Sequence, residues 1–339
     1  MKSPQKRILV TGGCGYIGSH FLHQIASGNH PVVVVDNLCS GLATSLIDQQ
    51  PLEICDFGDY AGMLNIFRSY DIEAIVHFAA HISVPESVAN PLKYYSNNTA
   101  NLVNLLSLCQ EFSVKRFIFS STAAVYGEVK ECTPIEETAS LSPANPYGRS
   151  KFMSEKILQD FAATNDMTYV IFRYFNVSGA DSSGKIGQSS PNATNLVKVA
   201  AQVATAQRHE IEIFGTDFPT PDGTAIRDYV HVEDVATAHL LGLEYLRQNR
   251  ESQILNIGYG TGYSVREVVN AASEIIGQAI PTKFSSRRPG DVAIAVASAN
   301  RIKSVLHWQP KFNSLEQIVG SAIRWERCII GQTHQRKAS

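Results

Sequence analysis

Residues 7–20 read RILVTGGCGYIGSH, and glycines are concentrated where an apolar run gives way to a helical pattern. The run RILVTG is typical of a buried strand, and the helical pattern begins at Tyr16. Gly12, Gly15 and Gly18 permit a tight turn and let the backbone approach a pyrophosphate, while the helix start offers it unpaired N–H groups. The segment predicts a dinucleotide-binding strand–turn–helix unit, although a purely structural glycine turn is the alternative.

A carboxylate stands where the adenosine of such a dinucleotide is expected. Asp36 ends the apolar run PVVVVD, 18 residues beyond Gly18. A carboxylate at this point accepts hydrogen bonds from ribose hydroxyls and repels a 2′-phosphate. The sequence therefore favours NAD over NADP as the cofactor.

The first half of the chain alternates apolar, β-rich runs with helical stretches. We expect strands at 7–12, 31–36, 74–80, 115–127, 168–176 and 254–258, with helices from Tyr16, through 100–110, from Asn145 and over 232–246. Runs that are apolar on both faces are typical of parallel strands buried between helices. We therefore predict an α/β fold, a doubly wound parallel sheet of Rossmann type with a smaller α+β substrate domain.

The composition changes after residue 177, where Gly, Ser, Asp and Pro dominate 178–192 and a turn-rich stretch covers 215–229. We expect an NAD-binding domain over 1–177 plus about 230–260. A substrate-binding domain is expected over 178–229 plus 261–330, with a loose tail over 331–339.

Bulk composition excludes several classes of protein. A net charge of −2 gives no reason to expect a nucleic acid or an anionic membrane as the partner. No apolar run approaches the roughly 20 residues that cross a bilayer, and the N-terminal run is too short for a signal peptide. The six scattered cysteines and ten histidines show no metal-ligand spacing, so we expect reduced thiols, no metal site and a cytoplasmic location.

The segment NPYGRSK predicts a helix that begins at Asn145, a good N-cap, with Pro146 at the first helical position. Tyr147 and Lys151 then lie one turn apart on the same face. On this spacing alone, a partly exposed tyrosine above a solvated lysine is the ordinary alternative.

Beside a nicotinamide, the same pair gains a chemical role. A free phenol has a pKa of about 10, and we expect the charges of Lys151 and a positive nicotinamide ring to lower that value. Thr122 ends the strand FIFSST at the carboxyl edge of the sheet, where ligands of open α/β folds bind. We therefore predict Tyr147 as the general base, with Lys151 and Thr122 as the other catalytic residues.

Together these residues resemble the extended short-chain dehydrogenase/reductase family, with its GxxGxxG turn, strand Ser/Thr and Tyr-x-x-x-Lys. The stretches PESVANPLKYYSNN, SSTAAVYG, RYFNVSGA, FGTDFPTPDGTAIRDYVHV and RRPGD are similar to the UDP-sugar 4-epimerases of that family, from about residue 7 to 327. The resemblance implies NAD-dependent interconversion of UDP-glucose and UDP-galactose through a 4-keto sugar. The N-acetylated sugar pair is left open as a further substrate.

The resemblance also implies two sets of binding residues. The NAD set is Gly12, Gly15, Tyr16, Ile17, Asp36, Asn37, Asp56, Phe57, Phe78, Ala79, Asn97, Tyr147, Lys151 and Tyr174. The UDP-sugar set is Thr122, Phe175, Asn176, Asn195, Leu196, Phe214, Arg227, Tyr229, Arg288, Asp291 and Ala295. Two guanidinium groups and a carboxylate in the second set suit a diphosphate and ribose hydroxyls.

Three positions depart from the family pattern. Thr122 replaces a serine and keeps the hydroxyl, and Ile82 stands where some members carry a lysine. Ala295 stands where a tyrosine narrows the sugar pocket in some members, which leaves the substrate range open.

The nearest rival function is that of a nucleotide-sugar 4,6-dehydratase or decarboxylase on the same scaffold. A dehydratase typically carries Asp-Glu after the strand Ser/Thr, whereas here Ala123 and Ala124 follow Thr122. A non-catalytic dinucleotide sensor is the rival from another class. The resemblance finally implies a homodimer that packs helices near 92–111 and 146–164.

Overall fold

The computed structural model describes residues 5–28, 30–47, 50–129, 134–190, 193–288 and 290–338. Its centre is a seven-stranded sheet in which every pair of neighbours is parallel, in the order β11-β6-β5-β4-β1-β2-β3. Its strands are β1 (Lys6–Thr11), β2 (Val32–Asp36), β3 (Leu52–Ile54), β4 (Asp71–His77), β5 (Arg116–Thr122), β6 (Thr168–Tyr174) and β11 (Gln253–Ile257). The predicted doubly wound parallel sheet is confirmed.

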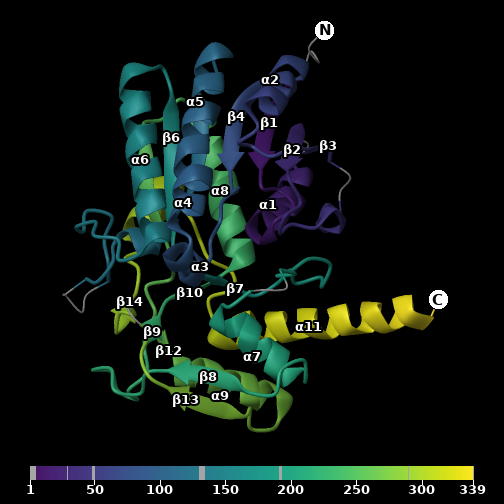
Figure 1. The fold of residues 1–339 in the computed structure, drawn as a ribbon, viewed down its shortest axis with the longest axis vertical. Coiled ribbons are helices and arrows are strands. Elements are labelled where there is room, and N and C mark those ends of the chain that lie inside the picture. The colour runs from purple at the N-terminus through teal and green to yellow at the C-terminus, as the bar shows by residue number, and fades with distance from the viewer. Residues whose placement is uncertain are drawn as a thin grey trace.

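Helices cover both faces of this sheet (Figure 1). One face packs against α1 (Tyr16–Ala26), α8 (Val232–Arg247) and α10 (Asn300–Leu306), and the other against α2 (Tyr60–Ser69), α5 (Asn101–Glu111) and α6 (Pro146–Thr164). Successive strand residues point to opposite faces, so Ile8 and Val10 join the first core and Leu9 the second. This double burial explains why the strands are apolar throughout.

The predicted strands 74–80 and 115–127 end several residues earlier than expected, and both endings matter for the site. β4 ends at His77 and β5 at Thr122, where a 3₁₀ turn, η3 (Ala123–Val125), follows. The order reverses between β1 and β4, because the chain runs from β1 out to β3 and returns on the other side. Ligands of open α/β sheets bind outside the carboxyl ends of the strands at such a point.

Short elements connect the large ones. The 3₁₀ turn η1 (Ala43–Ser45) follows β2, while α3 (Val84–Ala89), α4 (Pro91–Tyr94) and the π-helical turn η2 (Tyr95–Ala100) lie against α6, and η2 runs directly into α5.

A second, smaller part lies below the main sheet in Figure 1. Its core is formed by α7 (Leu196–Ala204), α9 (Val265–Ile276), α11 (Leu315–Ala338), β8 (Ile211–Phe214) and β13 (Thr282–Ser285). Short strands lie between the two parts: β7 (Asn176–Ser178) pairs with β10 (Tyr229–His231), and β9 (Ile226–Arg227) pairs with β12 (Tyr263–Ser264) and β14 (Ile294–Ala295).

The chain passes between the two parts more often than the sequence suggests. Ile302, Leu306 and Trp308 come from the stretch expected in the second domain, yet they pack in the core beside α1 and α8. Helix α11 continues to Ala338, through the segment expected to be a loose tail. The proposed domain boundaries therefore remain a coarse division of the chain.

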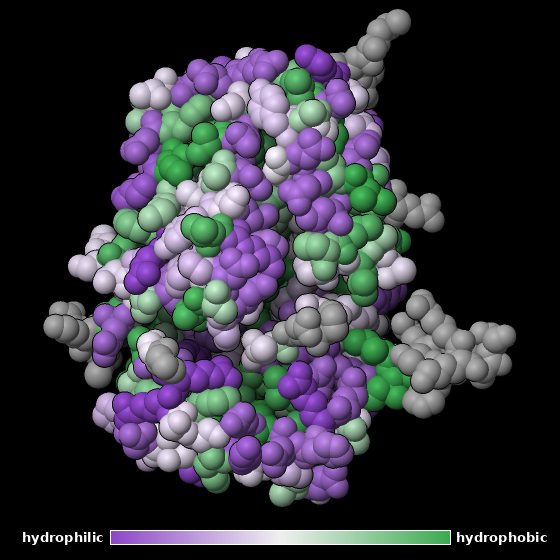
Figure 2. Space-filling model, viewed as in Figure 1, coloured by the Kyte–Doolittle hydropathy of each residue, from purple (hydrophilic) through white to green (hydrophobic). Residues whose placement is uncertain are grey.

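The surface gives no sign of a membrane-spanning segment. Hydrophilic and hydrophobic residues are mixed over the face seen in Figure 2. Within the described ranges, no helix combines the length and the hydropathy needed to cross a bilayer.

Candidate active site

The glycine-rich turn joins β1 to α1 beside the point where the strand order reverses. Gly12 has φ +71°, and a Cβ there would lie 2.6 Å from the backbone nitrogen of Ala79. A Cβ on Gly18 would lie 2.4 Å from the carbonyl oxygen of Gly12. The N-cap of α1 is Gly15, which offers no side-chain acceptor to the first turn of the helix. The N–H groups of that turn are therefore available to an anionic ligand.

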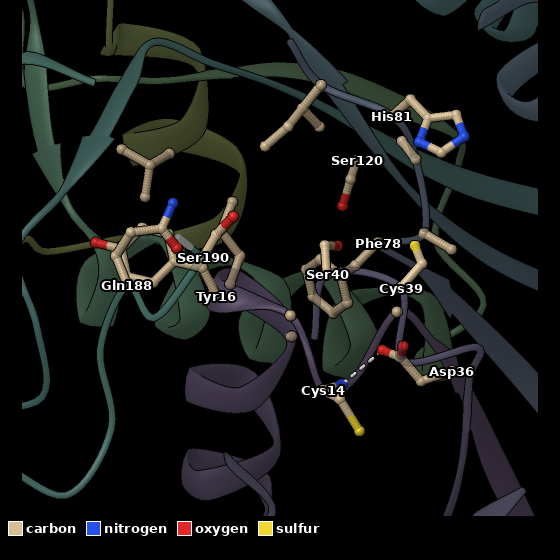
Figure 3. Close-up of a pocket in the computed structure, with 18 of the residues that line it drawn as sticks. Cys14, Tyr16, Asp36, Cys39, Ser40, Phe78, His81, Ser120, Gln188 and Ser190 are labelled. Atoms are coloured by element: carbon tan, nitrogen blue, oxygen red, sulfur yellow. Dashed lines mark hydrogen bonds between the residues drawn. The ribbon is translucent and has the colours of Figure 1, made fainter. Parts of the chain in front are cut away.

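The carboxylate of Asp36 is fixed at the end of β2. One oxygen accepts a hydrogen bond from the backbone N–H of Cys14 (2.9 Å, dashed in Figure 3), and the other accepts from that of Leu38 (2.8 Å). Asp36 is buried but still lines the cavity described next. Its position is therefore set by the backbone of the glycine turn itself.

A cavity of about 400 Å³ opens over these strand ends, within the usual range for small-molecule sites. Its lining includes the predicted cofactor residues Gly12, Gly15, Tyr16, Ile17, Asp36, Asn37, Phe57, Phe78, Ala79, Asn97, Tyr147, Lys151 and Tyr174. Asp56 is not among the lining residues, but its carboxylate accepts a hydrogen bond of 2.7 Å from the side chain of Asn37. A glycine cradle, an uncapped helix start and a fixed carboxylate in one cavity fit a dinucleotide.

Helix α6 brings the predicted catalytic residues to the same cavity. The side chain of Asn145 caps the helix by accepting from the N–H of Gly148 (2.9 Å), and Pro146 is its first residue. Tyr147 and Thr122 line the cavity together. Burial raises the pKa of Tyr147, and a hydrogen bond with the Thr122 hydroxyl lowers it.

Lys151 lies one turn farther along α6 and is almost completely buried. Its ammonium donates to the carbonyl of Ser120 on β5 (2.8 Å) and lies 4.9 Å from the ring centre of Phe119. Burial lowers the pKa of Lys151 to about 7, while the nearby carboxylate of Glu155 raises it. Lys151 therefore holds its proton less tightly than an exposed lysine does.

Protein groups alone raise the pKa of Tyr147. The expectation was that Lys151 and the positive nicotinamide ring of bound NAD together lower it; among the protein groups, desolvation of the buried phenol is the largest effect and the net shift is upward. The protein group that opposes this shift is the hydroxyl of Thr122, since the ammonium of Lys151 is directed to a backbone carbonyl.

The predicted UDP-sugar residues divide into two groups. Thr122, Phe175, Asn176 and Asn195 line the cavity, whereas the others are absent from its lining. Arg227 lies 3.5 Å from the carboxylate of Asp291, and the guanidinium of Arg288 lies 3.7 Å from the ring centre of Phe214. These pairs gather two cations in the second part, although Pro289 of the RRPGD segment lies outside the described residues.

Three members of the UDP-sugar set, Asn195 among them, also have structural roles. The side chain of Asn195 caps α7 by accepting from the N–H of Lys198 (2.8 Å), and Leu196 is the first residue of that helix. Tyr229 is buried in the core of the second part. The roles of these residues toward a ligand remain predictions.

Of the positions that depart from the family pattern, Ile82 lines the cavity, whereas Ala295 lies outside its lining. Ile82 lines the cavity and is 65% exposed, so it leaves an apolar side chain at the mouth. Ala295 is paired in register with Arg227 and packs in a small cluster with Phe175 and Tyr126. Ala295 is therefore close both to a predicted cavity residue and to a predicted diphosphate residue.

Sequence reasoning missed several residues of the cavity wall. His81 follows the end of β4, and Ser120 lies just before the end of β5. Their position at the carboxyl edge of the sheet could therefore have been predicted. Gly187–Ser190 and Cys39 come from irregular segments and carry no motif. Figure 3 shows Gln188 and Ser190 close to Tyr16, on one side of the cavity.

The sequence predicts no metal site, a prediction that bears on how His, Cys, Asp and Glu side chains group in the described residues. Within the described ranges, no three His, Cys, Asp or Glu side chains group in a way that could hold a metal ion. His20, one of the histidines near the glycine turn, is buried and bonded to the Tyr16 carbonyl through Nδ1 (2.7 Å).

Comparisons with known proteins agree on one family. The model of the NAD dependent epimerase/dehydratase family matches residues 8–258. The UDP-glucose 4-epimerase of Azospirillum brasilense is 48% identical over 95% of this chain and 92% of its own length. The solved UDP-glucose-4-epimerase from Stenotrophomonas maltophila, with bound NAD and formylated UDP-arabinopyranose, has a TM-score of 0.92 at 38% identity, covering 96% of this chain and 99% of that one. The UDP-Glc/GlcNAc 4-epimerase of Campylobacter jejuni has a TM-score of 0.83 at 44% identity, covering 95% and 99%.

Proposed function

Because the chain belongs to the NAD dependent epimerase/dehydratase family, we propose that it interconverts UDP-glucose and UDP-galactose by inverting the configuration at C4. The observation that carries the proposal is the meeting of Tyr147, Thr122 and Lys151 with the glycine turn in a single cavity. Five relatives that are 41–48% identical over 94–95% of the chain are named UDP-glucose 4-epimerase.

NAD is the cofactor; when bound, it would supply a nicotinamide ring able to take up the hydride of the sugar C4 and give it back. The glycine turn and the start of α1 bind the pyrophosphate, and Asp36 accepts from the adenosine ribose. Tyr147 removes the proton from the sugar 4-OH and gives it back, while the Thr122 hydroxyl orients that proton. Lys151 supplies positive charge behind the phenol.

Inversion requires that the keto sugar turn over while the nucleotide stays in place. Arg227 and Arg288 grip the diphosphate, Asp291 accepts from the uridine ribose, and Phe214 flanks the base. The sugar itself is held loosely near Phe175 and Asn176. The diphosphate then acts as the tether about which the sugar turns.

Two features argue against the rival functions. Thr122 is followed by Ala123 and Ala124 in the 3₁₀ turn η3, and methyl side chains cannot carry the protons that dehydration requires. A dinucleotide sensor has no need of a general base, whereas this chain places Tyr147 beside Thr122.

A second substrate pair is favoured by one observation. Ala295 packs with Phe175 and Tyr126, where a larger side chain would occupy space near the sugar. We therefore propose that UDP-N-acetylglucosamine and UDP-N-acetylgalactosamine are also interconverted. The relative from Campylobacter jejuni is named for both the glucose and the N-acetylglucosamine substrate.

We also propose a cytoplasmic homodimer with the domain division given above. The support for the dimer is a set of exposed apolar side chains on α4, α5 and α6, which are Leu92 (76% exposed), Val103 (45%) and Met153 (44%). Exposed side chains of this kind on neighbouring helices are typical of a surface that a partner covers.

The test of the proposed function is incubation of the purified protein with UDP-galactose and no added NAD. We expect UDP-glucose to accumulate until the two sugars reach equilibrium. A dehydratase gives a product lighter by one water, and a sensor leaves the substrate unchanged. Either of these results excludes the proposal.

A further inference from the structure

A short segment from the second part of the chain forms one wall of the cavity. Gly187–Ser190, here called the strap, lies beside the start of α1, and Figure 3 shows Gln188 and Ser190 next to Tyr16. Tyr16 and Gln188 also share the lining of a small adjoining pocket. The strap is therefore on the side of the cavity where the dinucleotide pyrophosphate is expected.

The strap is tied at its N-terminal end to the glycine-turn side of the molecule. Gly187 forms a β-bridge with Ala180, and the N–H of Asp181 donates to the Ile186 carbonyl (3.1 Å). The hydroxyl of Tyr16 donates to the carbonyl of Gly179 (2.6 Å). The hairpin that carries the strap is thus attached to the first residue of α1.

At its centre, the strap is held by two side chains from distant helices. The carbonyl of Gln188 accepts from the ammonium of Lys198 on α7 (2.6 Å) and from the indole N–H of Trp325 on α11 (3.2 Å). Lys198 also pairs with Glu326, and both side chains are buried. A Cβ on Gly187 would lie 2.5 Å from Cγ of Trp325, so the strap lies directly on the indole ring.

We propose that Trp325 and Lys198 are positioning residues that hold the strap over bound NAD and so keep the cofactor in the site between turnovers. The inference rests on the proposed placement of NAD in this cavity. A reaction that returns the hydride to the substrate it came from requires a cofactor that does not leave during the cycle. Lys198 and Trp325 lie outside the lining of the main cavity, so they act on it through their contacts with Gly187 and Gln188 of the strap.

The chain offers a matched pair of variants, because it has two tryptophans. Trp325→Phe removes the indole N–H that holds the strap. Trp308→Phe removes the indole N–H of the other buried tryptophan, which donates to the Asp234 carbonyl (3.0 Å) away from the cavity. Each substitution deletes one N–H-to-carbonyl bond, so a general loss of stability affects both proteins alike.

The measurement is the exchange of bound NAD for added radiolabelled NAD in the purified holoenzyme. We expect Trp325→Phe to exchange about fivefold to tenfold faster than the wild type, as the loss of one hydrogen bond implies. Trp308→Phe is expected to stay within about twofold of the wild type. Trp325→Phe should lose turnover on dilution and regain it when NAD is added. A merely structural defect would not be reversed by NAD.

Gly187→Ala tests the same contact from the other side, should Trp325→Phe fail to fold. Its methyl group displaces the strap from the indole, and we expect faster NAD exchange here too. Wild-type exchange rates in the folded variants would overturn the inference while leaving the proposed function intact. A wild-type protein that binds no NAD would refute the proposed function, and the inference with it.

Discussion

In the proposed reaction, the phenol of Tyr147 loses and regains a proton in every turnover, yet its protein surroundings favour the neutral form. Burial raises the pKa of Tyr147, and the bond with Thr122 offsets only part of that rise. The charge of Lys151 is itself weakened, because burial lowers the pKa of the ammonium to about 7. Formation of the phenolate therefore depends on the positive charge of the bound cofactor as well as on protein groups.

The role of Tyr147 can be tested by deleting its hydroxyl and keeping its ring. Tyr147→Phe should lower kcat by roughly 10²–10⁴, the usual worth of a general base. The affinity for UDP should hardly change, since Arg227 and Arg288 lie outside the lining of this cavity. Steady-state kinetics and calorimetry with UDP separate the two effects. Near wild-type turnover in the variant would show that the Tyr147 and Lys151 pair is only structural.

The role of Ala295 can be tested by restoring the missing ring. Ala295 packs against the cluster that contains Phe175 and Tyr126, so a tyrosine at this position is expected to crowd the space near the sugar. Overpacking typically costs about 1–3 kcal/mol, so Ala295→Tyr should cut activity on the N-acetylated pair by roughly tenfold or more. The same variant should largely keep its activity on UDP-galactose, which serves as the internal control. Absence of N-acetyl activity in the wild type would contradict the open pocket.

At the scale of elements, the site depends on how α6 is fixed to the ends of β5 and β6. Glu155 on α6 accepts from Arg173 of β6 (2.7 Å to Oε2) and from the hydroxyl of Ser121 on β5. Ser121 lies between Ser120, which binds Lys151, and Thr122, which binds Tyr147. The buried carboxylate therefore couples the helix to the strand, and breaking such a pair typically costs about 3–5 kcal/mol.

Elements that a short sequence pattern specifies could be predicted from the sequence. The glycine turn is one, because Gly12 needs a positive φ and Gly18 allows no side chain. The start of α6 is another, because Asn145 and Pro146 suit the first positions of a helix. Asp36 was predictable at the end of its strand, since the apolar run and its spacing fix where the strand ends.

Elements whose positions depend on distant contacts could not be predicted. The strap is held by Trp325, which is 137 residues from Gln188 and belongs to no recognisable motif. The ion pair of Glu155 and Arg173 joins α6 to β6, and no sequence motif indicates this pairing either. The π-helical turn before α5 and the extension of α11 to Ala338 likewise follow no sequence pattern that we used.

At the scale of the whole molecule, the main sheet and the second part share one cavity. The sheet contributes the glycine turn, Thr122 and Tyr147, while the second part contributes the strap and Asn195. In the proposed mechanism, the main sheet thus provides the cofactor cradle and the groups that move the proton, while the second part provides the strap and the residues that hold UDP. This division suits a reaction in which no reducing equivalent is gained or lost overall.

The central claim is that the hydride removed from C4 returns to C4 of the same sugar. The most direct measurement is the conversion of UDP-galactose carrying deuterium at C4, with no added NAD, followed by NMR or mass analysis of the UDP-glucose formed. The account predicts UDP-glucose that keeps the deuterium at C4. Hydrogen from the solvent at that position would contradict it, because it would require removal of C4 hydrogen as a proton or loss of the hydride from the site.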